Sequence, residues 1–426
     1  MDTIFALASG RGKAGIAVVR ISGAFAFDAA RQLCGDLPPL GGRGLRVIRN
    51  SVGDALDEAL VLVFSADHSF TGEDVVELHL HGSIAIVAAV QNALSLINGL
   101  RLAEPGEFSR RALENERLDL SRIEGLSDMI EAETEAQRKQ AMRVFSGSLS
   151  DKVTAWRKDL VRAASLIEAT IDFVDEDVPV DVLPEVSELL QRTIADLKSE
   201  AVGTGIAERV RDGFEVAIVG PPNAGKSTLL NYLAGRDAAI TSEIAGTTRD
   251  VIEVRMDLGG IPVTLLDTAG LRDGQDQVEI IGIERSIQRA NDADIRIFLG
   301  PDDLGVQRKK DDLERAPKAD VCGNPDNGVS GFTGFGVTSL LNDLQRALES
   351  RVALVGSAIK DRHRVAISRA ISGINAGLTE FSHGEDRADI AAEELRAAIN
   401  ALDSLVGRVD VEHILDEIFA NFCIGK

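Results

Sequence analysis

The sequence predicts a multidomain protein in which an inserted α/β domain interrupts an all-α helical domain, after an α+β N-terminal domain. Residues 1–117 mix short β-like runs with one helical pattern. Long amphipathic helices occupy two separate stretches, 118–213 and 351–426, and strands alternate with helices over 214–350. Because an exposed loop tolerates the insertion of a whole domain, we expect the two helical stretches to build one domain around the insert.

Composition excludes several classes of protein. The 46 basic and 68 acidic residues give a net charge of -22, so no global attraction to nucleic acid or to an anionic membrane is expected. Three widely spaced cysteines argue against a disulfide framework and for a reducing compartment. No stretch reaches the roughly 18 apolar residues of a membrane span. We expect a cytoplasmic protein with no membrane segment.

The N-terminal part contains a glycine pattern that could be mistaken for a cofactor site. "GRGKAG", with Gly10, Gly12 and Gly15, matches the dinucleotide fingerprint G-x-G-x-x-G. That fingerprint must open a helix, whereas "IAVVRI" follows and is rich in β-branched residues. We therefore interpret the pattern as a turn between strands.

Four arginines gather where the helical part begins. "SRRALENERLDLSR" contains Arg110, Arg111, Arg117 and Arg122 in an otherwise acidic chain. A local basic patch is what an RNA contact would need. A solvated helix face is the interpretation that we favour.

A phosphate-binding loop is the strongest signal in the chain. In "GFEVAIVGPPNAGKSTLLNYLAG", a buried strand runs into G-x-x-x-x-G-K-S and then into a helix. Glycines let backbone N–H groups close around phosphates, while Lys226 neutralises the β and γ oxygens. The Ser227 hydroxyl lies at a helix N-terminus, where it can reach Mg²⁺.

Two downstream segments fit the same site. "DTAG", residues 267–270, follows the apolar strand "IPVTLL", and Asp267 is placed to hold the water shell of Mg²⁺. Gly270 can offer its N–H to a γ-phosphate. "TSEIAGTTRD" lies between the two motifs and contains Thr247 and Thr248, either of which could complete the coordination of Mg²⁺. In this order the three motifs predict the switch segments of a GTPase.

The residue that orients the attacking water is not evident from these motifs. Ras-type enzymes place a glutamine after the glycine of the second motif, and this chain has Leu271 there. Spacing alone does not choose among the acidic residues that come after it, which are Asp273, Asp276, Glu279 and Glu284.

The base-recognition segment departs from the N-K-x-D pattern of GTPases. The closest match runs from Pro317 through Lys318 to Asp320, with proline in place of asparagine and no evident strand before it. An alternative, Asn324 to Asn327, lacks the lysine and the aspartate. "VSGFTGFG", which contains Ser330, resembles the last base-contacting loop in altered form. The residues alone therefore do not decide whether the site is specific for guanine.

The motifs together resemble the tRNA uridine-modification GTPase family MnmE, also called TrmE. The resemblance rests on segments spread over nearly the whole chain, which are "GIAVVRISG", "FTGEDVVELHLHG", "PGEFSRRALENERLDL", "GPPNAGKSTLLN", "EIAGTTRDV", "DTAGLR", "VEIIGIER" and the terminal "FCIGK". It implies an N-terminal folate-binding and dimerisation domain (1–117), a helical domain from 118–213 and 351–426, and an inserted Ras-like P-loop G domain (214–350).

The resemblance also implies an activity, cofactors and partners. The family is similar in working as a homodimer that binds 5-formyltetrahydrofolate or a related one-carbon folate. With the FAD-dependent protein MnmG, in an expected heterotetramer, it installs an aminomethyl or carboxymethylaminomethyl group on the wobble uridine of certain tRNAs. Its G domains hydrolyse GTP with Mg²⁺ and with K⁺, which takes the place of an arginine finger.

Site residues follow from the resemblance position by position. Glu279 would orient the water. The GTP-binding residues would be Asn223, Ala224, Gly225, Lys226, Ser227, Thr228, Ser242, Glu243, Ile244, Ala245, Gly246, Thr247, Thr248, Asp267, Thr268, Ala269 and Gly270, with Lys318, Asp320 and Ser330 on the base. Mg²⁺ would be held by Ser227 and Thr248, with Asp267 through water. K⁺ would be held by Asn223, Ser242, Ile244 and Thr247. Folate would be bound by Arg20, Glu77, Arg117 and Lys426.

The C-terminal "NFCIGK" has three interpretations. A prenylation signal requires C-a-a-X with aliphatic middle residues, and Gly425 and Lys426 exclude it. The apolar "EHILDEIFANF" predicts a docked helix. The resemblance to the MnmE family implies that Gly425 lets the chain leave that helix and carry Lys426 toward the folate pocket. Cys423 would lie nearby, and we favour a packed over a chemical role for it.

A competing function is a translational or ribosome-assembly GTPase that uses its nucleotide as a timer and binds no folate. Such a timer has no need of Arg20, Glu77 and a terminal lysine converging on one pocket. Folate binding therefore separates the two hypotheses.

Overall fold

The computed structural model divides into two compact units. It describes residues 2–172, 182–236, 239, 253–267, 287–300, 305–323, 326–353, 355–383, 387–409, 419, 422 and 425. One unit comprises residues 1–123 and 406–426, and the other residues 124–405. The domain boundaries expected from the sequence stay predictions.

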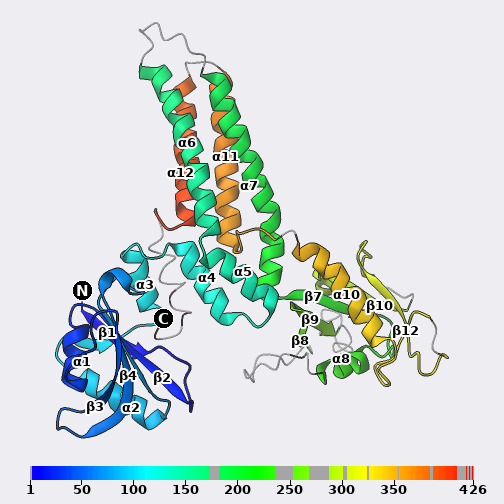
Figure 1. Ribbon diagram of the computed structural model, residues 1–426. Helices are drawn as coiled ribbons and strands as arrows, with labels where there is room; N and C mark the ends of the chain where they lie inside the picture. Colours follow the sequence, from blue (N-terminus) through cyan, green and yellow to red (C-terminus); the bar gives the residue numbers. More distant parts are fainter. Residues whose placement is uncertain are drawn as a thin grey trace, which may run out of the picture. The chain divides into compact units, whose positions relative to one another are not determined.

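The first unit contains a six-stranded mixed sheet (Figure 1). The strand order is β3-β4-β5-β2-β1-β6. Its strands are β1 (Thr3–Leu7), β2 (Ile16–Ser22), β3 (Arg43–Arg49), β4 (Ala55–Phe64), β5 (Val75–His81) and β6 (Leu100–Leu102). Its helices are α1 (Ala26–Cys34), α2 (Ile84–Ser95) and α3 (Glu107–Glu114). β2 directly follows "GRGKAG", so the turn interpretation of that pattern is confirmed.

Alternation along the strands gives this sheet two different faces. Val19 and Ile21 of β2 pack with Leu78 of β5 and with α1 and α2 in one hydrophobic cluster. Arg20 and Glu77 point the other way because successive side chains in a strand alternate. On that second face Ile4 and Ala6 pack with Phe108 of α3 in a smaller cluster. The sheet thus carries its charged pair opposite its main core.

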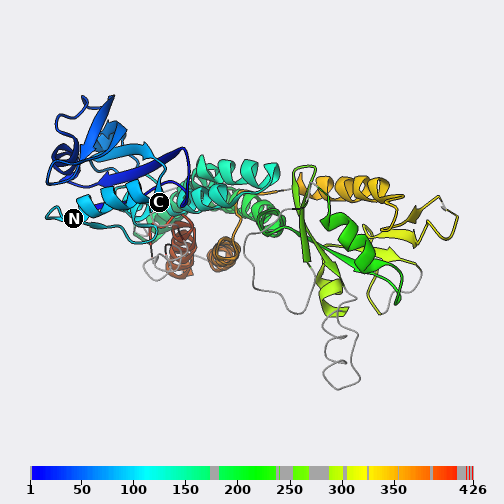
Figure 2. The same cartoon turned by 90° about the horizontal axis from the view of Figure 1, so that it is seen from below.

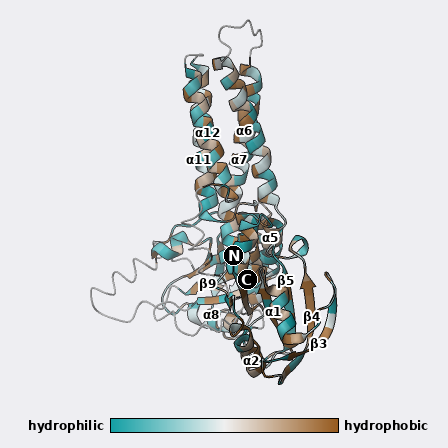
Figure 3. Ribbon diagram, turned by 90° about the vertical axis from the view of Figure 1, so that its left-hand side faces the viewer, coloured by the Kyte–Doolittle hydropathy of each residue, from teal (hydrophilic) through white to brown (hydrophobic). Residues whose placement is uncertain are grey.

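Four long helices of the second unit form a bundle. They are α6 (Ser148–Asp172), α7 (Leu183–Asp212), α11 (Asp361–Ser382) and α12 (Ala388–Leu405). Each packs on two others, α6 on α7 and α12, and α11 on the same two. Figure 2 shows α11 and α12 end-on, side by side, and Figure 3 shows hydrophobic and hydrophilic residues on each helix of the bundle. No helix among the described residues is long and apolar enough to cross a membrane.

A buried carboxylate joins the two sequence segments that build the helical part. Glu124 of α4 (Leu120–Glu131) accepts a hydrogen bond from Arg362 Nε at 2.7 Å and one from His363 Nε2 at 3.0 Å. Arg362 also donates to the carbonyls of Ser404 and Leu405, both at 3.2 Å. Burial alone would raise the pKa of Glu124, but the Arg362 charge and the His363 contact hold it well below its usual range. This buried ionic contact links the N-terminal and C-terminal helical segments, together with the ion pairs Arg157–Asp403 and Glu168–Arg396.

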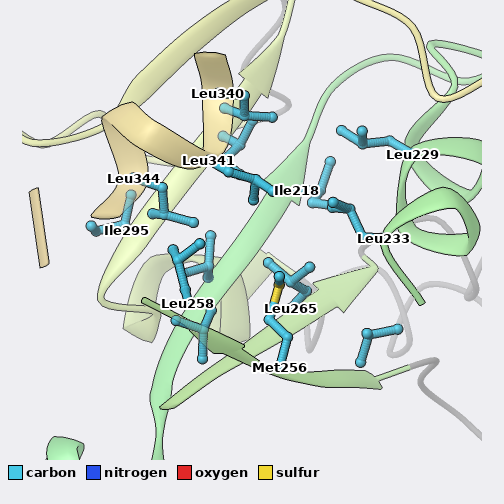
Figure 4. Packing of buried hydrophobic residues seen from close by; sticks show 14 of the residues in the cluster. Ile218, Leu229, Leu233, Met256, Leu258, Leu265, Ile295, Leu340, Leu341 and Leu344 are labelled. Atoms are coloured by element: carbon cyan, nitrogen blue, oxygen red, sulfur yellow. The ribbon is translucent and has the colours of Figure 1, made fainter. Parts of the chain in front are cut away.

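The inserted α/β part is a second six-stranded sheet with strand order β12-β11-β10-β7-β9-β8. Its strands are β7 (Phe214–Val219), β8 (Glu253–Leu258), β9 (Ile261–Asp267), β10 (Ile295–Leu299), β11 (Leu313–Pro317) and β12 (Gly328–Val329). Only β8 runs antiparallel to its neighbour. Leucines of α8 (Lys226–Ala234) and α10 (Val337–Val352) pack with Ile218 and Leu265 of the sheet in one core cluster, shown in Figure 4.

Two elements differ from the sequence prediction. β11 precedes Lys318 although no strand was expected there. α12 ends at Leu405, just before Gly407, whose φ of 80° lies in the left-handed region, so the helical stretch expected over 351–426 is interrupted there. The first difference bears directly on base recognition.

Asp128 carries a prediction about stability. It lies one turn after Glu124, and its buried Oδ2 has no hydrogen-bond partner among the described residues. Burial raises its pKa to about 6. A carboxyl with a raised folded-state pKa stabilises the protein below its unfolded pKa, and that contribution is lost as pH rises toward 6.

The Asp128→Asn variant should therefore gain stability over the wild type as pH rises from 4 to 8, reaching about 1–3 kcal/mol. Calorimetric melting of both proteins across that range measures the gain. The exposed Asp196 of α7, changed to asparagine, should show no such trend. A gain for Asp128→Asn that is the same at pH 4 and pH 8 would contradict the assignment.

Candidate functional site

The phosphate loop, residues 220–225, joins the buried strand β7 to helix α8. Gly225 has φ 94° and Asn223 has φ 60°, both in the left-handed region that glycine and asparagine tolerate best. A Cβ at Gly220 would lie 2.7 Å from the carbonyl oxygen of Leu299 on β10, so only glycine fits there. The backbone conformation and close packing of the loop thus explain the residues at positions 220, 223 and 225.

Lys226 is held within this loop. Its side chain is buried, and its ammonium donates to the carbonyl oxygens of Gly220 at 2.8 Å and Pro221 at 3.0 Å. Both acceptors belong to the backbone of the loop. The lysine charge therefore lies beside the N–H groups at the start of α8, where a phosphate would bind.

Ser227 and Asp267 meet although they are forty residues apart. The Ser227 hydroxyl donates to Asp267 Oδ2 at 2.6 Å. Asp267 ends β9, all seven residues of which are buried. A hydroxyl and a carboxylate are hard oxygen donors of the kind that Mg²⁺ prefers. The residues fit the ion that the sequence predicts for them.

Sheet topology explains why these groups converge. The chain passes from β7 to β9 on one side of β7 and then to β10 on the other side. In open α/β sheets, ligands bind at the carboxyl ends of the strands where the order reverses in this way. The phosphate loop and Asp267 both lie at that edge.

The base-recognition candidates lie along the same edge. Lys318 and Asp320 directly follow β11, and Ser330 directly follows β12. The Ala319 N–H donates to the Val329 carbonyl at 3.2 Å, which joins the two loops. The prediction that no strand precedes Pro317 is wrong. Pro317 ends β11, so the segment has the strand context that base recognition requires.

The alternative base-recognition segment, Asn324 to Asn327, is only partly described, and its last residue makes a contact within the sheet. Asn324 and Pro325 lie outside the described residues. Asn327 precedes β12, and its side-chain amide donates to the Glu314 carbonyl at 2.7 Å. This contact connects the start of β12 to β11. It favours a structural role for Asn327.

A second candidate site lies on the charged face of the N-terminal sheet. Arg20 and Glu77 are cross-strand partners in β2 and β5. Arg20 Nε donates to Glu77 Oε1 at 2.9 Å, and His79 Nε2 lies 3.3 Å from Glu77 Oε2. The rings of Phe70 and Phe108 flank the Arg20 guanidinium, with centroids 5.5 and 5.6 Å from its carbon.

The sequence analysis missed these two aromatic rings. They come from a loop and a helix far apart in the sequence, and a single phenylalanine in either segment is typical of a core position. Phe108 is fully buried and Phe70 is half-buried, so of the two rings only Phe70 can offer part of a flat apolar surface beside the charged pair. Such a face suits a ligand with a flat ring and polar edges.

Arg117 and the end of the chain contact different parts of this unit. Arg117 is exposed, and a Cβ at Gly72 would lie 3.1 Å from its Cγ, so its stem lies beside the loop that contains Phe70. A Cβ at Gly425 would lie 2.0 Å from the Leu7 carbonyl oxygen. Leu7 pairs across β1 and β2 with Val19, the neighbour of Arg20. The penultimate residue is thus packed against the strand beside the predicted folate site.

Part of the predicted site lies outside the described residues. These residues are Ser242, Glu243, Ile244, Ala245, Gly246, Thr247, Thr248, Thr268, Ala269, Gly270, Glu279, Cys423 and Lys426. Their predicted roles stay predictions.

Arg111 corrects the interpretation of the arginine-rich segment as a solvated face. Its side chain is only 4% exposed. Its guanidinium contacts carboxylates of Asp2, Glu73 and Glu107, each at 3.0 Å. Burial opposes its charge, but the hydrogen bonds to Glu73 and Glu107 raise the pKa of Arg111. Arg111 therefore holds the unit together and is not accessible to RNA.

Comparison with known proteins finds relatives that match the chain over its whole length. A family model described as "GTP-binding protein TrmE N-terminus" matches residues 3–117, and one described as "MnmE helical domain" matches residues 120–423. "tRNA modification GTPase MnmE" of Roseobacter denitrificans is 58% identical over 428 residues, covering 100% of both chains. The protein of the same name from Cereibacter sphaeroides strain ATCC 17029 is 59% identical over 431 residues, again covering 100% of both.

Among solved structures, the G domain of the FeoB iron transporter of T. maritima matches with a TM-score of 0.22 and 20% identity. The match covers 32% of this chain and 98% of that chain. We draw no conclusion from a similarity this low.

The Ser227 contact yields a prediction about metal dependence. If Ser227 binds Mg²⁺ as the sequence predicts, replacing it by alanine should reduce the strengthening of nucleoside triphosphate binding by Mg²⁺ by at least about tenfold. Calorimetric titrations with Mg²⁺ and with EDTA measure that strengthening. Ser227→Thr keeps the hydroxyl and should behave as wild type. Equal strengthening in the alanine variant would exclude Ser227 as a ligand.

Proposed function

The chain belongs to the MnmE family of tRNA modification GTPases, and on that premise we propose that it hydrolyses GTP at the carboxyl edge of the inserted sheet to serve tRNA modification. The observation that carries the proposal is the convergence of the phosphate loop, Asp267 and the two base-recognition loops at one edge. Each group comes from a different strand, and each suits a different part of GTP.

In this proposal the residues of the loop bind the triphosphate. Backbone N–H groups at the start of α8 donate to the phosphates, and Lys226 leaves the Gly220 and Pro221 carbonyls to pair with the β and γ oxygens. Ser227 and Asp267 would hold Mg²⁺, directly and through water, with Thr248 as a further ligand. When bound, the ion draws charge from the phosphate oxygens during hydrolysis.

Hydrolysis requires an oriented water molecule. The water oxygen bonds to the γ-phosphorus as the bond to the bridging oxygen breaks, and the products are GDP and phosphate. Glu279, in "VEIIGIER", would orient that water, since Leu271 has no group to do so. Asn223, with Ser242, Ile244 and Thr247, would hold K⁺, which supplies positive charge beside the phosphates.

The charged face of the N-terminal sheet would bind a one-carbon folate such as 5-formyltetrahydrofolate. The Arg20–Glu77 pair offers both a donor and an acceptor, and the Phe70 and Phe108 rings lie beside Arg20. The flat pterin has N–H donors for a carboxylate, and the glutamate tail of folate has carboxylates for Arg117 and Lys426. Arginine at 117 keeps the charge of the more usual lysine and changes its geometry.

The remaining parts of the proposal concern partners. As a cytoplasmic homodimer, the chain would act with the FAD-dependent protein MnmG on the wobble uridine of certain tRNAs. The product would be a 5-aminomethyl or carboxymethylaminomethyl uridine. A GTPase timer without folate chemistry is the alternative, and it gives the Arg20–Glu77 face no ligand.

Folate binding tests the proposal against that alternative. We expect the full chain to bind 5-formyltetrahydrofolate, and Arg117→Ala to weaken binding by about tenfold, because a charged hydrogen bond is lost. Deleting Lys426 should weaken it similarly. Ligand fluorescence measures both effects.

Arg110→Ala is the matched control, since Arg110 is partly exposed and lies 3.6 Å from Glu114 on α3. It should leave folate affinity unchanged. A wild-type chain that binds no folate would favour the timer and reject the folate-dependent function.

A further inference from the structure

Phe332 is the most exposed large hydrophobic side chain of the inserted α/β part among the described residues. It is 81% exposed, whereas Phe335, three residues later in the same loop, is 41% exposed. A single exposed apolar residue on a protein surface is ordinary. Phe332 differs because it directly follows Ser330 and Gly331 in the loop that the sequence assigns to base recognition.

Hydrogen bonds fix the backbone that carries Phe332. The Ser330 hydroxyl accepts from the N–H groups of Phe332 and Thr333, both at 3.2 Å. The Ser330 N–H donates to the Phe335 carbonyl at 3.0 Å, and the Gly334 N–H donates to the Ser330 carbonyl at 2.9 Å. The ring is therefore presented to solvent from a closed turn.

The same turn is packed on the helix that follows the phosphate loop. A Cβ at Gly331 would lie 2.5 Å from both Cα and N of Leu229 in α8. Only glycine allows this approach of one backbone to another. The backbone directly before Phe332 therefore lies against the first turn of α8, close to where the phosphates of a nucleotide would bind.

Lys318 lies in the neighbouring loop. It has φ 54°, a conformation uncommon for lysine, and it is exposed. The Ala319–Val329 hydrogen bond joins its loop to β12, directly before Ser330. Within the described part of the chain, neither the Lys318 ammonium nor the Asp320 carboxylate has a hydrogen-bond or ion-pair partner. One loop thus presents a cation and an acceptor, and the other presents an aromatic ring.

Purine bases match this set of groups. A base is flat and stacks on aromatic side chains through its π face, and the alkyl stem of a lysine can cover an apolar surface. The Asp320 carboxylate can accept two guanine N–H groups. Pro317 stands where the N-K-x-D pattern of GTPases has asparagine, so the side chain at that position offers no hydrogen bond. Stacking would make up for the lost polar contact.

We propose that the guanine base of GTP is held between the ring of Phe332 and the alkyl stem of Lys318, with Phe332 as a main determinant of nucleotide affinity. The proposal rests on the function proposed above, and it adds a residue and a mode of recognition to it. Stacking strengthens the binding of any purine, while Asp320 chooses guanine among purines.

Affinity measurements separate stacking from hydrogen bonding. For Phe332→Ala in the full chain with Mg²⁺, we expect GDP affinity to fall by about tenfold. IDP lacks the exocyclic amino group of GDP, and its affinity should fall by the same factor, so the GDP-to-IDP ratio should stay constant. Phe335→Ala is the matched control, from the same loop, and should bind both nucleotides as wild type does.

A spectroscopic readout reports on the ring itself. Trp156, buried in α6, is the one tryptophan of the chain. Phe332→Trp adds a second tryptophan, whose fluorescence should be quenched by GDP as the base stacks on the indole. Phe335→Trp should show no comparable quenching. The conservative Phe332→Trp change should also retain GDP affinity.

Each outcome decides the matter. Unchanged GDP affinity in Phe332→Ala, with full loss in Lys226→Ala, would overturn the stacking proposal and leave the GTPase function in place. A fall for GDP with none for IDP would also overturn it, because stacking does not distinguish the two bases. A wild-type chain that binds no guanine nucleotide would overturn this proposal together with the proposed function.

Discussion

The central position of β7 is the constraint on which the nucleotide site depends. β9 and β10 both pair with β7, one on each side, so the strand order reverses at its carboxyl end. The phosphate loop leaves β7 there, and Gly220 passes against the Leu299 carbonyl of β10. A side chain at Gly220 would push the loop away from β10 and from the Lys226 ammonium that it holds. The packing of the sheet and the binding of phosphate thus both require glycine at position 220.

The α/β part can be inserted into the helical part because side-chain contacts hold together the helices on either side of the insertion. Glu124, from before the insertion, is bound by Arg362 and His363, from after it. His363 accepts the N–H groups of Ile359 and Lys360 at Nδ1, so its Nε2 carries the proton that it donates to Glu124. Burial lowers the pKa of His363, which favours this neutral form. One side chain therefore caps α11 and ties α4 to it.

The fold class could be predicted because its signals are local. β7, β9 and α8 have strong apolar patterns, and the phosphate loop has a motif whose spacing follows from its chemistry. β11 could not be predicted, since "LERAP" contains Arg315, a buried arginine that is paired with Asp343 of α10. Arg111 could not be placed for the same reason, because one of its partners, Asp2, is 109 residues away. From the sequence alone, a charged residue is expected to be exposed unless its distant partner is known. The rings near Arg20 were missed for a related reason, because they come together only in the folded protein.

Hydrolysis of GTP and of ATP by the full chain, measured in K⁺ with Mg²⁺, tests most directly whether this sheet edge is a guanine-nucleotide site. A site built to accept hydrogen bonds from guanine leaves its carboxylate unpaired with adenine. We predict that kcat/KM for GTP exceeds that for ATP by at least about tenfold. Equal values, or a higher value for ATP, would contradict the roles given to Lys318, Asp320 and Ser330.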